Sequence, residues 1–86
     1  MGNILELGSS DVLKVRVWHT ISKTVPHGWP ENGCLFFTVN KGITIREFIE
    51  QINKHRRPEY HIKKLHTRNG GIYNPSEVLY RNDLYI

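Results

Sequence analysis

The last third of the chain decides the fold. It spans Ile62–Ile86 and reads IKKLHTRNGGIYNPSEVLYRNDLYI. It joins a basic segment, a glycine-containing turn, a proline-containing turn and a short closing segment. Its apolar residues, which we expect to face the core, are Ile62, Leu65, Ile72, Leu79 and Leu84. Their spacing predicts short extended elements rather than a long helix.

Turn residues divide this stretch into smaller elements. Gly70 and Gly71 permit the positive φ of a tight hairpin turn. Asn74 before Pro75 matches an N-cap residue followed by proline at the first helical position. In chain order we therefore predict a strand at 62–67, a turn at 69–71, a strand stub at 72–73, a single helical turn at Pro75–Leu79 and a closing strand at Asp83–Ile86.

Two further strands are predicted upstream. Val12–His19 alternates apolar and polar residues with a period of two, the pattern of a strand with one buried face. Cys34–Asn40 is rich in aromatic and β-branched residues and should pair back on it. Between them, Ile21–Gly33 holds two prolines and two glycines, which predicts a long loop. The two strands thus form a hairpin.

One main helix is expected after the hairpin. Thr44-Ile45-Arg46-Glu47 fits a capping box, in which the threonine and glutamate side chains satisfy backbone N–H groups at the helix start. Pro58 prevents the helix from continuing. One face carries apolar residues at helical spacing: Ile45, Phe48, Ile49 and Ile52.

The element order ββαββ with a late helical turn predicts an α+β domain. It matches a ubiquitin-like β-grasp, in which a mixed sheet of four to five strands packs on one main helix. We assign residues 12–86 to this domain. Residues 1–11 are small and polar, and we expect them to be a disordered end, in part left over from cloning.

Composition narrows the class of protein. No apolar run approaches the roughly 18 residues of a membrane span, and no signal peptide is visible. The single cysteine, Cys34, cannot form an internal disulfide, so we expect a reducing, cytoplasmic location. The net charge is +4, and residues 41–70 alone hold eight cations against three acids. This local excess favours an anionic partner: nucleic acid, a lipid surface or an acidic protein.

Four sequence runs carry a family resemblance. They are KVRVW in the first strand, TIREFIEQI in the helix, IKKLHTRNGG in the following strand and turn, and SEVLYRNDLYI at the end. Together they resemble a doublecortin domain, a family with a basic first strand, a helix of the form F-x-x-L-L-x-x-[LI], a hairpin V-R-x-[LI]-[YH]-T-x-x-G and a final x-E-L-x-x-x-x-x-Y-[VI]. The resemblance covers Lys14–Ile86, and IKKLHTRNGG followed by SEVLYRNDLYI is its most specific part.

The resemblance implies binding to tubulin, usually to microtubules in the groove between protofilaments, and a place on the cytoskeleton. Family positions rich in arginine or lysine correspond to Lys41, Lys54 and Lys63. Two features depart from the family. The loop Ile21–Gly33 replaces a short Asn-Gly-Asp turn, and a single domain stands where many members carry two. The sequence is then either a fragment of a larger protein or similar to single-domain members such as the apicortin type.

The expected function is a non-enzymatic module that binds and stabilises tubulin polymers through a basic face, because tubulin surfaces are strongly acidic. From the residues alone, the same cations also fit an ordinary solvated surface. The predicted tubulin-binding residues are Lys41, Lys54, Arg56, Arg57, Lys63 and Lys64, with Trp18, Arg46 and Arg68 as accessory contacts.

The remaining reactive residues do not form a recognisable catalytic or metal-binding pattern. His55, His61 and His66 lack the paired short spacing of zinc ligands, so we expect neither metal nor cofactor. Cys34 is expected to be buried in its strand rather than to act as a nucleophile. Trp29 is expected to fold its loop onto the sheet, because an exposed indole on a mobile loop is unfavourable.

Two alternatives to tubulin binding stay open. One is a ubiquitin-like adaptor that binds a folded protein through the sheet, with Lys14, Arg16 and Trp18 as contacts. The other, the weaker, is a nucleic-acid binder, which clustered aromatic residues between the cations would support better. We do not expect a small-molecule substrate or a membrane partner.

Overall fold

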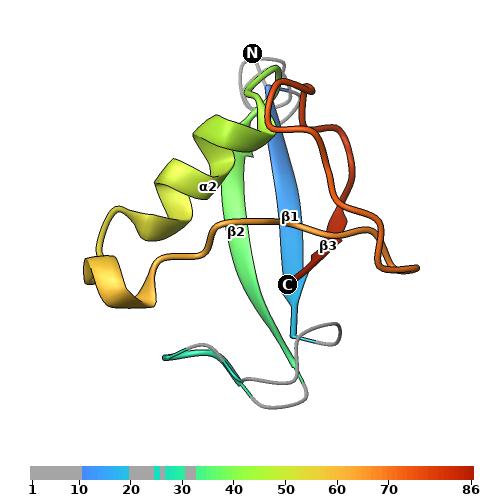
Figure 1. The fold of residues 1–86 in the computed structure, drawn as a ribbon. Helices are drawn as coiled ribbons and strands as arrows, with labels where there is room; N and C mark the ends of the chain where they lie inside the picture. Colours follow the sequence, from blue (N-terminus) through green and yellow to red (C-terminus); the bar gives the residue numbers. More distant parts are fainter. Residues whose placement is uncertain (1–10, 20–24, 26, 31–32) are drawn as a thin grey trace.

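A computed structural model describes residues 11–19, 25, 27–30 and 33–86. Its sheet contains β1 (Val12–Trp18), β2 (Cys34–Asn40) and β3 (Asp83–Tyr85), in the order β2-β1-β3. One helix, α2 (Ile45–Asn53), and a short 3₁₀ helix, η1 (Pro58–Tyr60), follow the hairpin. Figure 1 shows α2 on one side of the hairpin and β3 on the other. The protein is therefore a small α+β domain with a mixed three-stranded sheet.

The predicted hairpin is confirmed. β1 and β2 pair antiparallel from Val12 opposite Asn40 to Trp18 opposite Cys34. Along β1, Val15 and Val17 are buried while Lys14 and Arg16 are exposed, as the period-two pattern predicts. The predicted loop at 21–33 lies largely outside the described residues, as does the N-terminal segment up to residue 10.

β3 joins the other edge of β1 in parallel, with Arg16 opposite Asp83 and Trp18 opposite Tyr85. A parallel pair requires a long crossover, and α2 with the chain that follows it provides one. The C-terminal segment therefore lies beside the first strand of the chain, and the closing strand predicted at Asp83–Ile86 is confirmed to within one residue.

The capping box that begins α2 is confirmed. The Thr44 N–H donates to Glu47 Oε1 at 2.8 Å, and the Glu47 N–H donates to Thr44 Oγ1 at 3.2 Å. Ile45, Phe48 and Ile52 are buried, which places the predicted apolar face against the sheet. The helix ends at Asn53 with Lys54 as its C-cap, and Pro58 opens η1 instead of ending α2.

The strands predicted at 62–67 and 72–73 are wrong. His66 forms single bridges to Tyr85 and to Ile72, and no ladder extends from them. The reason lies in competing partners. The backbone of Ile62 pairs with the side chain of Asn53 instead of with a strand. The Tyr73 N–H does donate to the Leu65 carbonyl at 2.9 Å, but this pairing stops at the single His66–Ile72 bridge. The segment is extended, yet the described sheet has three strands instead of four to five.

The helical turn predicted at Pro75–Leu79 is also wrong. Residues 74–77 form a hydrogen-bonded turn in which the Glu77 N–H donates to the Asn74 carbonyl at 3.0 Å. The carbonyls of Pro75 and Glu77 accept from the N–H groups of Arg46 and Ile45, at 3.0 and 2.8 Å. These are donors that the first turn of a helix leaves without intrahelical partners. The segment therefore caps α2, and its carbonyls are not free to form a helix of their own.

The core lies between the sheet, α2 and the segment after η1. Its fully buried side chains include Val15, Val17, Ile45, Phe48, Leu65 and Leu84. Trp29 is buried, and its Nε1 donates to the Val17 carbonyl at 3.0 Å, so the predicted folding of this tryptophan onto the sheet is confirmed. Two predictions fail: Ile72 is 59% exposed, and Cys34 on the edge strand is half-buried.

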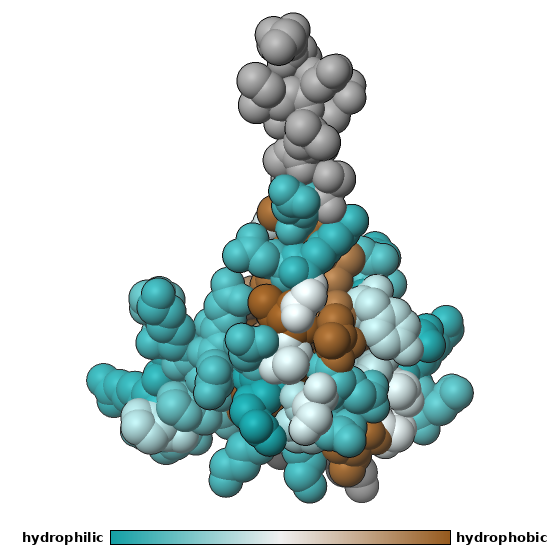
Figure 2. All heavy atoms as spheres, turned by 90° about the horizontal axis from the view of Figure 1, so that it is seen from above, coloured by the Kyte–Doolittle hydropathy of each residue, from teal (hydrophilic) through white to brown (hydrophobic). Residues whose placement is uncertain are grey.

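One face of the molecule is predominantly hydrophilic. Figure 2 shows mostly hydrophilic side chains on the face seen from above, with a few hydrophobic spots near its middle. No helix among the described residues is long and apolar enough to cross a membrane.

Candidate functional site

The side chain of Asn53 holds the chain after η1 against the end of α2. Its Nδ2 donates to the Ile62 carbonyl, and its Oδ1 accepts from the Ile62 N–H, both at 2.8 Å. We call this pair of hydrogen bonds the clamp. Lys54 directly follows Asn53 in the sequence, and Lys63 directly follows Ile62. The clamp therefore holds the segment that carries Lys63 against the helix end that carries Lys54, nine positions earlier in the sequence.

Four cations surround the clamp on exposed positions. They are Lys54, Arg57, Lys63 and Lys64, which we call the helix-end cations. The described residues form a single ion pair, between Arg16 and Asp83, so none of these four charges has an acidic partner there. Their charge is thus presented to solvent, where it attracts anionic surfaces.

The other predicted contacts lie elsewhere. Lys41 is exposed in the turn between β2 and α2, at the opposite end of the helix from Lys54. Nine helical residues span about 14 Å, so Lys41 and the helix-end cations do not form one cluster. Arg46 lies near the start of α2, and Arg68 lies in the turn after the extended segment.

Arg56 differs from its neighbours because its guanidinium is used within the fold. Its Nε donates to the Tyr60 carbonyl at 2.8 Å, and its Cζ lies 5.6 Å from the centre of the Trp29 ring. The Arg56 carbonyl in turn contacts His61 Nε2 at 3.0 Å. Arg56 therefore ties the buried tryptophan to the helix end, while Arg57 beside it stays exposed.

A hollow of about 430 Å³ adjoins this helix end. It is lined by His27, Gly28, His55, Arg56, Arg57 and Tyr60. The rings of His27 and Tyr60 stack with their centres 4.4 Å apart. The hollow gives the cationic surface a concave part, into which an acidic side chain of a partner could reach.

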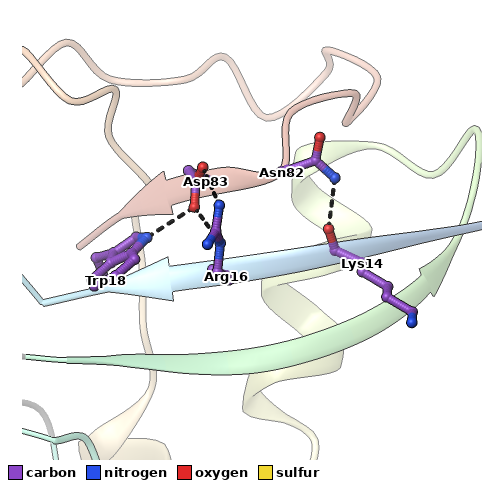
Figure 3. Close-up of polar contacts among 5 residues, drawn as sticks. All are labelled: Lys14, Arg16, Trp18, Asn82 and Asp83. Atoms are coloured by element: carbon purple, nitrogen blue, oxygen red, sulfur yellow. Dashed lines mark hydrogen bonds and ion pairs between the residues drawn. The ribbon is translucent and has the colours of Figure 1, made fainter.

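The outward face of the sheet carries the second candidate site. Figure 3 shows Arg16 and Trp18 of β1 converging on Asp83 of β3. Arg16 Nε lies 2.8 Å from Asp83 Oδ1, and Arg16 Nη2 donates to Oδ2 at 3.0 Å. Trp18 Nε1 also donates to Oδ1 at 3.0 Å. The carboxylate thus joins β3 to β1 through side chains as well as backbone.

These contacts shift the pKa of Asp83. The hydrogen bond from Trp18 is the largest cause that lowers it below its usual value, and Arg16 lowers it further; partial burial opposes them. The charged form is favoured because donors and a cation face it. Asp83 is therefore ionised across the physiological pH range and neutralises Arg16.

An apolar side chain stands out beside this ion pair. Phe36, opposite Arg16 in the register, is 77% exposed. It borders a hollow of about 460 Å³ whose other lining residues include Lys14, Thr38 and Asn82. Aromatic and arginine side chains are enriched at the energetically important positions of protein interfaces. This part of the sheet face therefore resembles a small protein-binding surface.

No group of three histidine, cysteine or acidic side chains that could hold a metal ion occurs in the part of the chain that the structure describes. His66 is half-buried, and its Nδ1 has no hydrogen-bond partner among the described residues.

Sequence reasoning missed two residues that organise these sites. Asp83 was assigned only to a strand, since nothing in the sequence pairs it with Arg16, 67 positions away. Asn53 was not singled out, although an asparagine at a helix end before a proline-ended loop is a signal for side-chain capping of nearby backbone. Both act through contacts that only the folded chain creates.

The fold and the surface define a class of protein: a small α+β domain with a cationic helix end that has no acidic partner among the described residues. Comparison of the chain with family models, with curated proteins and with solved structures found no match in any of the three. Its function must therefore be argued from its own residues.

Proposed function

We propose that this chain is a doublecortin-like module with a ubiquitin-like β-grasp fold, which binds and stabilises tubulin polymers and is not an enzyme. The antiparallel β1–β2 hairpin, the parallel β1–β3 pair and the helix between them agree with this fold. His66 forms single bridges to Tyr85 of β3 and to Ile72, at the edge of the sheet where a β-grasp has its further strands. The sequence resemblance covers the same elements.

The observation that carries the proposal is the clamp between Asn53 and Ile62. It holds the segment that carries Lys63 against the helix end that carries Lys54, and both lysines correspond to basic positions of the doublecortin family. With Arg57 and Lys64 they form a surface of four cations without acidic partners among the described residues. An acidic polymer surface such as that of tubulin would be attracted by them.

In this arrangement the helix-end cations are the main contacts. Arg56 has a structural role beside this surface, because its guanidinium contacts the Tyr60 carbonyl and the Trp29 ring. Lys41, Arg46 and Arg68 would engage only if the partner surface extends along the whole domain. Such an extended contact fits a groove between two protofilaments better than a single small ligand.

Microtubule co-sedimentation at a series of salt concentrations tests this proposal. We expect the chain to pellet with microtubules at low salt and to be released as salt rises, since screening weakens exposed charge contacts. The double variant Lys54→Glu/Lys63→Glu should lose about tenfold or more in affinity, because two attractive contacts become repulsive. Lys14→Glu, on the opposite side of the sheet, is the matched control and should pellet normally.

Two outcomes would count against it. Failure of the unmodified chain to pellet at low salt would remove the tubulin proposal. Normal pelleting of the double variant, with its fold intact by circular dichroism, would remove the helix-end cations as the binding surface.

A second candidate function is an adaptor that binds a folded protein through the outward sheet face. The exposure of Phe36 beside Lys14 and Arg16 favours it. Binding of this kind should depend on Phe36 and change little with salt, because apolar contacts are not screened. Phe36→Ser would then abolish binding that Lys54→Glu/Lys63→Glu leaves unchanged.

A further inference from the structure

A third hollow lies between the turn that follows the extended segment and the end of the chain. Its volume is about 710 Å³, within the usual range of small-ligand sites. Figure 1 shows the turn around residue 70 extending beyond β3, away from α2. The side chains that give the hollow its character are Arg68, Tyr73, Tyr80, Arg81, Asn82 and Tyr85.

The charge of this hollow is positive even though Asp83 is part of its lining. Both carboxylate oxygens of Asp83 are engaged by Arg16, and one also accepts from Trp18. Arg68 and Arg81 have no acidic partner among the described residues. Two arginines that line the hollow are therefore not neutralised by any described residue, which suits an anionic ligand.

Tyr80 offers an accessible ring at the edge of the hollow. It is 64% exposed, and the Cζ of Arg81 lies 5.4 Å from the centre of its ring. A planar ligand could stack on this ring while its negative charge meets the neighbouring guanidinium. Base–aromatic stacking of this kind is a common way of binding nucleotides.

Tyr73 and Tyr85 form the fixed walls of the hollow. The Tyr73 N–H donates to the Leu65 carbonyl at 2.9 Å, and Tyr85 exchanges two backbone hydrogen bonds with His66. Burial raises the pKa of the Tyr73 hydroxyl, and the charge of Arg81 opposes this rise. The hydroxyl is therefore protonated at neutral pH and can donate a hydrogen bond to a phosphate oxygen.

Asn82 adds an acceptor. Its Nδ2 donates to the Lys14 carbonyl at 2.8 Å, which fixes the orientation of the amide. In Figure 3 the amide oxygen points away from Lys14. It can accept a hydrogen bond from an exocyclic amino group of a ligand.

We propose that this hollow binds a phosphate attached to a planar heterocycle, the chemistry of a nucleoside phosphate. The heterocycle would stack on Tyr80, and the phosphate would lie between Arg81 and Arg68. This site is separate from the helix-end cations, and it does not depend on tubulin binding. A purely carboxylate ligand is a poorer fit, because it would use the arginines and leave the tyrosine rings without contacts.

A phosphate attached to a planar heterocycle occurs both in free nucleotides and in single-stranded nucleic acid. One experiment with two arms distinguishes these two ligands. NMR titration of the labelled chain would use adenosine 5′-monophosphate in one arm and a short single-stranded oligoadenylate in the other. Tighter binding of the oligonucleotide by tenfold or more assigns nucleic acid as the source. Equal affinity per site assigns a free nucleotide.

Adenosine and inorganic phosphate serve as the component ligands. We expect adenosine 5′-monophosphate to shift the signals of Tyr80 and Arg81 and to bind at least tenfold more tightly than either component. Arg81→Gln and Tyr80→Ala should each weaken this binding by about tenfold. Both side chains are exposed, so the variants should fold. Arg57→Gln, which removes the same charge near η1, should bind normally.

Three results would overturn the proposal. The first is no saturable shift with any of the four ligands. The second is inorganic phosphate binding as tightly as the nucleotide, which would indicate an anion site without recognition of the ring. The third is unchanged nucleotide affinity in both Arg81→Gln and Tyr80→Ala.

Discussion

The outward sheet face and the helix end both carry exposed cations, but they use them differently. On the sheet, Arg16 is paired with Asp83, and its charge helps to join β3 to β1. At the helix end, an uncharged side chain, Asn53, holds the segment of Lys63 beside that of Lys54, and neither lysine has an acidic partner among the described residues. A charge satisfied inside the fold stabilises the protein, whereas an unsatisfied one is available to a partner.

Trp29 should give the largest effect, because it is buried and contacts both the Val17 carbonyl in β1 and Arg56 at the helix end. Trp29→Ala removes a buried ring that packs beside Phe37, and it leaves Arg56 without its aromatic contact. We expect it to lower the free energy of unfolding by about 3–5 kcal/mol, measured by urea denaturation. Trp29→Phe keeps much of the apolar area but loses the hydrogen bond to Val17, so it should cost about 1–2 kcal/mol. A small loss for Trp29→Ala would show that its loop does not depend on this contact.

Asn53 should rank next. Asn53→Ala removes two hydrogen bonds and leaves the backbone groups of Ile62 without partners, at a cost of about 2 kcal/mol in unfolding free energy. It should also weaken microtubule binding, since Lys63 is no longer held beside Lys54. Gln51→Ala, at an exposed position of the same helix, is the control and should change neither property. Full binding by Asn53→Ala would contradict the role given to the clamp.

Arg56 and Arg57 form a matched pair of adjacent arginines. Arg56→Gln loses the Tyr60 hydrogen bond and the contact with Trp29, so it should lower the unfolding free energy by about 1 kcal/mol. Arg57→Gln should leave stability unchanged and reduce microtubule affinity. Denaturation and co-sedimentation of both variants measure the two effects. If both variants lose stability equally, Arg56 does not stabilise the fold more than Arg57 does, and the different roles given to the two arginines are wrong.

Asp83 should give the smallest effect, a contribution to stability that is lost as the pH falls. Its folded pKa lies below its ordinary value of 3.8, so its stabilising contribution is fully present above that value and is lost as pH falls through the lower folded value. The stability of the native chain should therefore fall more steeply below about pH 4 than that of Asp83→Asn. Denaturation curves at a series of pH values between 3 and 6 would show this difference. Parallel curves would mean that the Trp18 and Arg16 contacts do not persist in solution.

Local patterns predicted the hairpin and the helix well. The alternation around Val15 and Val17 and the capping box at Thr44 depend on residues close together in the sequence, and both are confirmed. The C-terminal third was predicted less accurately. Its backbone groups hydrogen-bond to Asn53 and to the first turn of α2, which lie far away in the sequence. Local pattern cannot reveal such competition between partners.

For the candidate sites, too, the sequence predicted some features and missed others. The excess of cations at 41–70 could be read from the sequence, as could the helix that presents part of it. The pairing of Lys54 with Lys63, the separation of Lys41 and the internal use of Arg56 could not. Likewise, nothing in the sequence brought Tyr73, Tyr80 and Tyr85 together with two arginines.

The sequence by itself determined the hairpin, the position and apolar face of α2, the burial of Trp29 and the local excess of positive charge. These follow from periodicity, capping and composition, which act over a few residues. The tertiary structure alone decided which cations are neutralised and which remain free. That outcome depends on contacts such as Arg16 with Asp83 and Asn53 with Ile62, which form only when distant segments pack together.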